Sequence, residues 1–284
     1  MYKRQGYNKI TNTLNFDGLF NSGERITLTN VLSGDHHIED NHEQSNYYAV
    51  SSEFPLGYDG LFVSFRASKM EYKLSAPFDS TKPSGYSTEY NLTLNQPIIE
   101  RSDFNLNTSF SLGNNKYVND LGTGNNSNKD IWKSNLNLGF DSRDSNLGGG
   151  INYGSFGLTL AKVDLTDNPS NLSIDQSNAD SNGRNFKGML NLNRLNKLTS
   201  KTNVLLKFNG QLAADNLDGA DQLSLGGSSA VRAYPSNEAA GDIGFIASLE
   251  LKRNLFKNIE STLFYDYGKI KLHKKLWNNW NSTN

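Results

Sequence analysis

The residue types that most often carry catalysis or bind metals are sparse and poorly arranged in this chain. Its 284 residues include four histidines and no cysteine, which excludes thiol catalysis, thiolate metal ligands and disulfides. Three of the histidines, His36, His37 and His42, share one polar segment, but no ligand partner at a fixed spacing accompanies them. We therefore expect no metal site and no bound cofactor.

Other groups that could do chemistry have simpler structural explanations. Asp141, Arg143 and Asp144 together fit a solvated strand end. The glycines at 148–150 lack the spacing and the following helix of a phosphate-binding loop, and they favour close backbone packing or a bend. No Gly-x-Ser-x-Gly nucleophile elbow occurs. The sequence thus predicts a protein that is not an enzyme and takes no small-molecule substrate.

Charge and hydropathy further restrict the class of protein to which the chain can belong. The 28 basic and 29 acidic residues nearly cancel, which argues against a nucleic-acid partner and against a polybasic membrane patch. Mean hydropathy is −0.61, and no apolar run approaches the roughly 20 residues of a membrane-spanning helix. A transmembrane barrel is compatible with these values because only alternate residues of each strand face lipid.

Alternation with period two dominates the chain. In the segment 104–112, Phe104, Leu106 and Phe110 alternate with asparagine and serine, which predicts a strand with one apolar and one wet face. The same rule predicts twelve strands, near 7–19, 24–33, 46–56, 60–72, 86–96, 104–112, 132–140, 147–163, 184–195, 204–212, 243–251 and 257–270. Most are about 9–13 residues long, enough for a tilted strand to cross a bilayer. No convincing helix is expected.

The connections alternate in length. Short turns are expected at 20–23, 56–60, 97–102, 196–200 and 255–258, and long polar links at 34–45, 73–85, 114–129, 164–183 and 214–240. Short turns on one rim and long loops on the other are typical of outer-membrane barrels, as are aromatic residues near strand ends such as Tyr58 and Trp132. We therefore predict an all-β fold, a transmembrane antiparallel β-barrel. A soluble β-protein that binds carbohydrate remains the alternative.

The most specific segment lies at 221–253, followed by a short motif at 264–268. Gly226 and Gly227 precede the run Val231, Arg232, Ala233 and Tyr234, and the later motif is formed by Phe264, Asp266 and Gly268. These residues resemble the haemolysin and haemagglutinin secretion/activation family, the barrel transporters of two-partner secretion. That family carries Gly-Gly and then Val-Arg-Gly-Tyr on a long loop inside the barrel lumen. Ala233 stands in place of the usual glycine, which would alter the loop tip if that glycine has a positive φ.

The resemblance implies a function. A large secreted exoprotein would pass through the lumen of a barrel that contacts lipid in the outer membrane of a Gram-negative-type bacterium. By strand parity Asp266 shares a face with Phe264, so an Arg232–Asp266 ion pair would hold the loop. A fully hydrated pair contributes about 0–1 kcal/mol. Further lumenal charges that would tune passage of the chain are Arg66, Lys207, Glu250 and Lys252.

The same resemblance sets the expected domain organisation. Family members carry a signal peptide, two periplasmic POTRA modules and a sixteen-stranded barrel. We expect residues 1–284 to be one partial barrel domain, with the long lumenal loop at about 214–240, with POTRA modules absent and with strands missing at both ends. Two functional alternatives stay open, a barrel-assembly insertase of the same superfamily and a passive porin-type or adhesin barrel.

Overall fold

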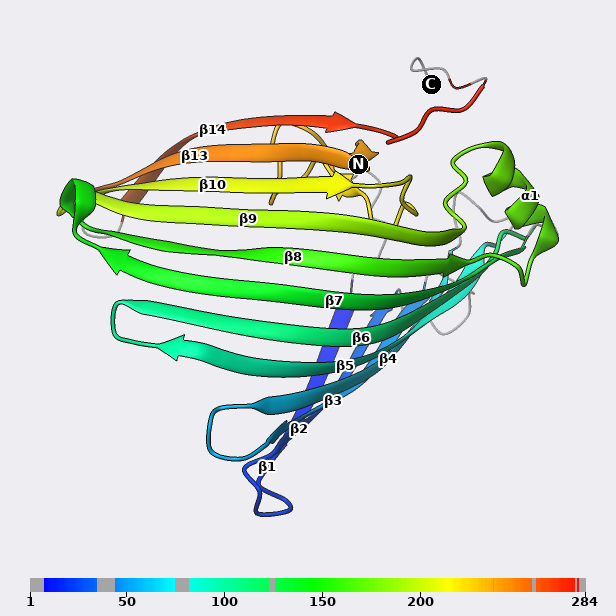
Figure 1. The fold of residues 1–284 in the computed structure, drawn as a ribbon, viewed down its shortest axis with the longest axis horizontal. Helices are drawn as coiled ribbons and strands as arrows, with labels where there is room; N and C mark the ends of the chain where they lie inside the picture. Colours follow the sequence, from blue (N-terminus) through cyan, green and yellow to red (C-terminus); the bar gives the residue numbers. More distant parts are fainter. Residues whose placement is uncertain are drawn as a thin grey trace. The chain divides into compact units, whose positions relative to one another are not determined.

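Twelve long strands form one sheet in the order β1 to β10, then β13 and β14 (Figure 1). This computed structural model describes residues 8–34, 44–74, 82–122, 126–236, 238–256, 259–278 and 280. The strands are β1 (Asn8–Asp17), β2 (Arg25–Gly34), β3 (Gln44–Pro55), β4 (Phe62–Lys73), β5 (Ser84–Glu100), β6 (Phe104–Asp120), β7 (Asn126–Asp144), β8 (Gly150–Asp164), β9 (Gly183–Thr199), β10 (Thr202–Ala213), β13 (Ile243–Phe256) and β14 (Ile259–Lys271). Neighbouring strands run antiparallel.

All twelve predicted strands are present, but the predicted long link at 114–129 is wrong. β6 continues to Asp120 and β7 begins at Asn126. The polar residues of this region predict a loop because they break the apolar alternation. In the structure they pair across the strands, since Asn114 Nδ2 donates to Asp130 Oδ1. Hydrogen bonding between side chains therefore keeps a polar stretch extended.

The expectation that the chain has no helix is also wrong. The helix α1 (Pro169–Ser177) lies in the link between β8 and β9, and a 3₁₀ turn, η1 (Asn146–Gly148), joins β7 to β8. Asn168 Oδ1 accepts hydrogen bonds from Ser170 N at 3.1 Å and Asn171 N at 3.2 Å, and Pro169 occupies the first helical position. These capping signals form the helix without an apolar stripe, which is why hydrophobic periodicity missed it. No helix in the described part of the chain is long and apolar enough to span a membrane, a finding without bearing on strands.

The chain divides into two compact units. The first comprises 1–96, 110–134 and 162–174, and the second comprises 97–109, 135–161 and 175–284. In the first unit, one row of directly opposed residues runs across β1 to β5, namely Leu14, Leu28, Val50, Ala67 and Tyr90. Leu14, Leu28 and Tyr90 in this row are exposed, so the row presents an apolar surface.

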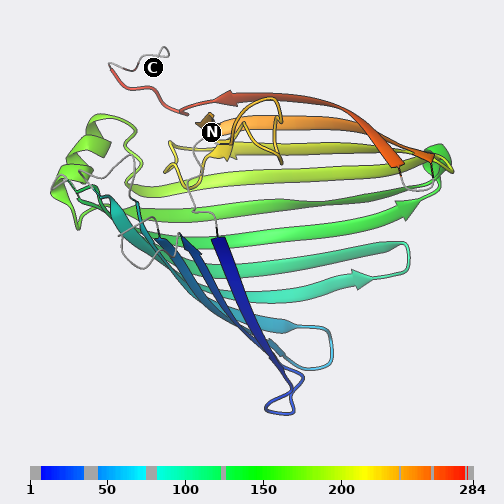
Figure 2. The ribbon, with the colours of Figure 1, turned by 180° about the vertical axis from the view of Figure 1, so that it is seen from behind.

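In the second unit the two faces of the sheet differ. One face is bare and mostly apolar, with the opposed residues Leu206, Leu249 and Tyr265 all exposed. The other face is covered by residues 214–240, which we call the signature loop; Figure 2 shows it in yellow to orange in front of β10 and β13. The core of the unit lies between loop and sheet, where Leu217, Val231 and Ile246 are buried.

The signature loop is closed at its base by a short pair of strands. β11 (Leu223–Ser224) pairs antiparallel with β12 (Ala240–Gly241). Leu225 N extends this ladder by donating to Ala239 O at 2.8 Å. The loop therefore returns on itself as a hairpin-like excursion from the end of β10 to the start of β13.

Candidate functional site

The tip of the signature loop meets β14 at three residues of one strand face. The guanidinium carbon of Arg232 lies 3.6 Å from the centroid of the Phe264 ring. Arg232 Nε and Nη2 donate to Asp266 Oδ2 and Oδ1 at 2.7 and 2.6 Å. Arg232 N also donates to Oδ2 at 3.1 Å, and Ser248 Oγ donates to Oδ1 at 2.7 Å. The Asp266 carboxylate thus accepts four hydrogen bonds, and the predicted ion pair is present in a two-pronged form.

Gly268 supplies the third contact by having no side chain. A Cβ at this position would lie 2.5 Å from Leu225 Cδ1 and 2.9 Å from Val231 Cγ2. The loop therefore packs on the strand only because residue 268 is glycine. Since Phe264, Asp266 and Gly268 are spaced by two, all three point toward the loop, which gives the motif a physical reason for its spacing.

A second carboxylate shares the arginine. Glu250 Oε1 lies 3.0 Å from Arg232 Nη1 and accepts a hydrogen bond from Lys207 Nζ at 3.0 Å. Lys252 Nζ lies 3.5 Å from the other Glu250 oxygen. Three cations therefore face two carboxylates across β10, β13, β14 and the loop. The sequence predicts Lys207, Glu250 and Lys252 only as separate lumenal charges that tune passage of the chain.

The cluster is less hydrated than the sequence suggested. The side chains of Asp266 and Glu250 are 4% and 6% exposed, whereas that of Arg232 is 25% exposed. The 0–1 kcal/mol expected of a hydrated pair does not apply to carboxylates this buried. Removing one member of a buried pair typically costs about 3–5 kcal/mol, because it leaves a desolvated charge without its partner.

The glycine pair shapes the loop just before the arginine. Gly227 has a φ of +127°, a conformation that favours glycine, and a Cβ on Gly226 would collide with Pro235 O and Tyr234 Cβ. Val231 N donates to Leu225 O at 3.0 Å, and Val231 is buried. The glycines therefore let the two arms of the loop approach, and they place Val231 in the core with Arg232 beside β14.

Ala233 does not sit in the left-handed region, since its φ is not positive. A glycine is therefore not required there by backbone conformation, and Ala233 is exposed beside a half-exposed Tyr234. The departure from the expected Val-Arg-Gly-Tyr pattern leaves the position of Arg232 intact.

The base of the loop is held by a buried polar group. Asp242 is fully buried, and its carboxylate accepts hydrogen bonds from Leu217 N at 3.2 Å, Gln222 Nε2 at 2.9 Å and Lys274 N at 2.7 Å. Gln211 Nε2 donates to Asp242 O at 3.2 Å. Both ends of the loop and the segment after β14 are thus tied to one carboxylate.

A buried ion pair supports the same base. Lys187 Nζ of β9 donates to Asp221 O at 2.8 Å and lies 3.1 Å from Asp221 Oδ1, with both side chains at most 10% exposed. Asn216 Nδ2 donates to Lys275 O at 2.9 Å. The loop is therefore anchored at its base by hydrogen bonds and at its tip by Arg232.

Comparison with known proteins agrees with this geometry. Residues 2–280 match the family model described as haemolysin secretion/activation protein ShlB/FhaC/HecB. The chain belongs to this family. The heme/hemopexin transporter protein HuxB of Haemophilus influenzae is 26% identical over 245 residues, which is 81% of this chain and 42% of that protein. The chain therefore spans less than half the length of the curated relatives it matches.

Solved structures show the same fold. CdiB from Escherichia coli matches with a TM-score of 0.73 at 18% identity, over 94% of this chain and 49% of that one. CdiB from Acinetobacter baumannii gives 0.70 at 17% identity, over 94% and 47%. BamA from Haemophilus ducreyi gives 0.58 at 15% identity, over 93% and 55%. The fold is that of an outer-membrane β-barrel, and membership of the ShlB/FhaC/HecB family places the chain in the outer membrane of a Gram-negative bacterium.

Several residues important to the loop of this family member were missed from the sequence. Lys187 and Asp242 lie far apart along the chain. Lys187 has no distinguishing pattern, and Asp242 lies within the specific segment 221–253 but has no predicted role. The one available signal for Asp242 was an acidic residue next to a glycine at the start of an otherwise apolar strand. Glu250 was noticed, but its contact with Arg232 was not foreseen, because only strand pairing brings β13 beside β14.

The remaining sequence candidates fall elsewhere. His36, His37 and His42 lie outside the described residues, and within the described ranges no group of acidic and histidine side chains could hold a metal. Arg66, in the first unit, hydrogen-bonds to Tyr47. The prediction that Asp144 belongs to a solvated strand end is wrong, because Asp144 Oδ2 lies 2.7 Å from Arg194 Nη1 in an ion pair.

The glycines at 148–150 shape the turn between β7 and β8. Gly148 and Gly149 have φ values of +89° and +94°. A Cβ on Gly148 would lie 2.6 Å from Lys197 O. This agrees with the predicted role in close backbone packing, although the glycines form a turn rather than a kink within a strand.

Proposed function

We propose that the protein containing this chain exports one large secreted protein through the lumen of its barrel. The covered face of the second unit lines that lumen, and the bare apolar face contacts lipid. The observation that carries the proposal is the signature loop, fixed at its tip by Arg232 to Asp266 and Glu250. These ion pairs hold the loop in the position from which transport starts, and their exchange lets the loop move and opens a path.

The ion pairs suit a reversible lock because they are polar and shared. Arg232 can leave Asp266 without stranding it completely, since Ser248 remains bonded to the carboxylate. Lys207 likewise stays beside Glu250 when the arginine moves. No nucleotide-binding or catalytic group is needed for this step, because entry of the exported chain supplies the competing contacts.

The test uses the full-length protein in its own bacterium. We expect deletion of the gene to remove one large protein from the culture medium, and restoration of the wild-type gene to return it. Restoration with Arg232→Ala should return much less, at equal outer-membrane abundance of the transporter. Arg25→Ala is the matched control, because the Arg25–Asp17 pair is more than half exposed and lies at a short turn.

Other outcomes would assign a different function. A general fall in outer-membrane barrels after deletion would indicate an insertase. Ion conductance that is unaffected by Arg232→Ala, together with an unchanged culture medium, would indicate a passive porin-type barrel. Either result would contradict export of a dedicated partner.

A further inference from the structure

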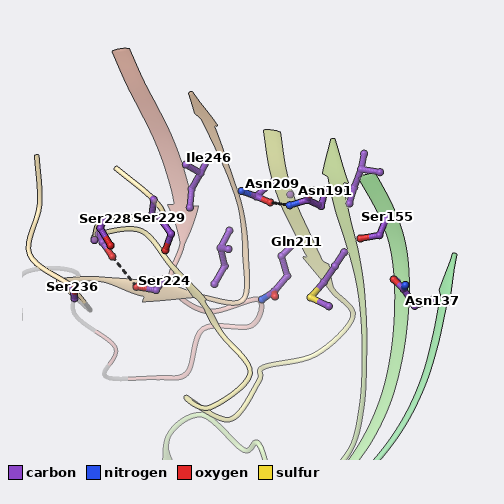
Figure 3. Close-up of a pocket in the computed structure, with 18 residues that line it drawn as sticks. Asn137, Ser155, Asn191, Asn209, Gln211, Ser224, Ser228, Ser229, Ser236 and Ile246 are labelled. Carbon is purple, nitrogen blue, oxygen red and sulfur yellow. Dashed lines mark hydrogen bonds between the residues drawn. The ribbon is translucent and has the colours of Figure 1, made fainter. Parts of the chain in front are cut away.

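A cavity of about 560 Å³ lies between the signature loop and the covered face of the sheet (Figure 3). Ser228 and Ser229 of the loop lie on one side, and strands β7 to β10 lie opposite. The polar side chains that line the strand side are Asn137, Ser155, Asn191, Asn209 and Gln211. We call this space the amide cavity.

The lining of the amide cavity is uncharged, and it combines polar side chains with apolar ones such as Met189, Leu190 and Ile246. None of its lining residues is acidic, basic or aromatic. Asn191 Nδ2 donates to Asn209 Oδ1 of the neighbouring strand, and Asn193 Nδ2 donates to Asn191 Oδ1 at 2.5 Å. The charged groups around Arg232 are not among the lining residues. The unit thus separates an ionic cluster from a neutral hydrogen-bonding surface.

This chemistry fits one kind of ligand better than others. Each asparagine offers an acceptor and two donors, and each serine offers both functions. An extended polypeptide presents N–H and C=O groups that need such partners when they leave water. An anionic ligand would need a cation in the lining, and a sugar would lack an aromatic ring to pack against. Gly157 and Gly210 also keep the strand side low enough for a backbone to approach.

We propose that the amide cavity binds an extended, uncharged stretch of polypeptide backbone, namely the part of the exported partner that passes the signature loop. The inference rests on the proposed function. Neutral amides form hydrogen bonds with a polypeptide backbone whatever its sequence. They form no strong ion pairs that would hold the exported chain in place. The cavity is therefore a sequence-independent contact beside the loop.

The test is binding of a labelled peptide to the purified full-length protein in detergent, followed by fluorescence anisotropy. The probe is a flexible peptide of glycine, serine and asparagine. We expect saturable binding that weakens at least about tenfold in Asn137→Leu/Asn209→Leu, because two hydrogen-bonding groups are lost. Asn203→Leu is the matched control, since Asn203 lies on the same strand and face as Asn209 but outside the cavity. The control should bind as the wild type does.

Three outcomes would overturn the inference. The first is no saturable binding of the peptide to the wild type, and the second is an equal loss of binding in the Asn203→Leu control. The third is equal binding of a maltooligosaccharide that is also lost in Asn137→Leu/Asn209→Leu. If the double variant does not fold, Ser155→Ala removes a single hydroxyl and should weaken binding more modestly. Export in cells is measured separately. A transporter that exports its partner but does not bind the peptide contradicts only this inference, whereas peptide binding without export contradicts only the proposed function.

Discussion

Arg232 Nη1 lies 3.0 Å from a carboxylate oxygen of Glu250, so the arginine of the signature loop pairs with β13 as well as with β14. Asp266 takes the other edge of the same guanidinium. One planar cation therefore joins the loop to two neighbouring strands, which a lysine could not do with the same geometry. Substitutions at the loop tip should therefore affect the stability of the protein and the export of its partner to different degrees.

We expect the Arg232–Asp266 pair to show strong coupling in a double-mutant cycle with Arg232→Ala and Asp266→Ala. The coupling should be about 1–3 kcal/mol, because the carboxylate is buried and makes four hydrogen bonds. Denaturant unfolding of the detergent-purified protein measures it. The exposed Arg25–Asp17 pair, with side chains 62% and 61% exposed, is the control and should give less than about 1 kcal/mol. Equal coupling in the two pairs would contradict desolvation of the site.

Gly268→Ala should loosen the loop. The new Cβ would lie 2.9 Å from Val231 Cγ2. Overpacking of this kind typically destabilises a protein by about 1–3 kcal/mol. Limited proteolysis should then cut the signature loop faster. Val231→Ala in the same chain should restore part of the protection, and Gly219→Ala, where nothing lies within 4 Å of the added atom, should have no effect. Unchanged proteolysis of Gly268→Ala would show that the loop does not pack on β14 in solution.

Ala233→Gly should not improve export or stability. Because φ at Ala233 is not positive, glycine relieves no strain and only adds freedom to the unfolded chain. We expect a loss of about 0.4–1 kcal/mol in unfolding free energy. A clear gain in either measurement would mean that residue 233 adopts the left-handed conformation during transport.

The turn between β1 and β2 should weaken in acid. Hydrogen bonds from Phe20 N at 2.5 Å and from Ser22 Oγ at 2.7 Å lower the pKa of Glu24 from its ordinary 4.5 to about 2. A carboxyl whose folded pKa is lowered stabilises the fold above its unfolded pKa. That stabilisation is lost as the pH falls from about 4.5 toward 2.

Glu24→Gln provides the comparison for that turn. The stability difference between wild type and variant should be largest near neutral pH and should disappear near pH 2, as measured by unfolding across a pH series. A stability difference that does not depend on pH would mean that Glu24 stabilises the turn through its shape and not through its charge.

Asp144→Ala should destabilise the barrel through Arg194. Arg194 is directly opposite Leu206, so it lies on the bare apolar face, where Asp144 and Asn152 accept its hydrogen bonds at 2.7 and 2.6 Å. Losing Asp144 leaves a charge without its partner, at a cost of about 1–3 kcal/mol. Asp144→Ala/Arg194→Leu should recover most of this loss in the same unfolding assay. A double variant less stable than Asp144→Ala alone would contradict the account.

Much of the fold could be predicted from the sequence because strand alternation is a local property. The positions of all twelve strands follow from which residues are apolar at a spacing of two. The face of Asp266 follows from the same parity, and so does its sharing of that face with Phe264. The predictions failed where local polarity is misleading, at 114–129, where side chains bond across strands, and at α1, which is capped rather than amphipathic.

The order of the residues is enough to predict the strand pattern, the glycine pair of the loop and the residue types that meet at the loop tip. The folded chain is needed to see that Glu250 shares Arg232, that Lys187 and Asp242 hold the base of the loop, and that an uncharged cavity lies beside it. These features depend on register. Contacts between strands and a folded-back loop depend on which residues stand opposite one another across many residues of chain, and alternation along a single strand carries no information about that alignment.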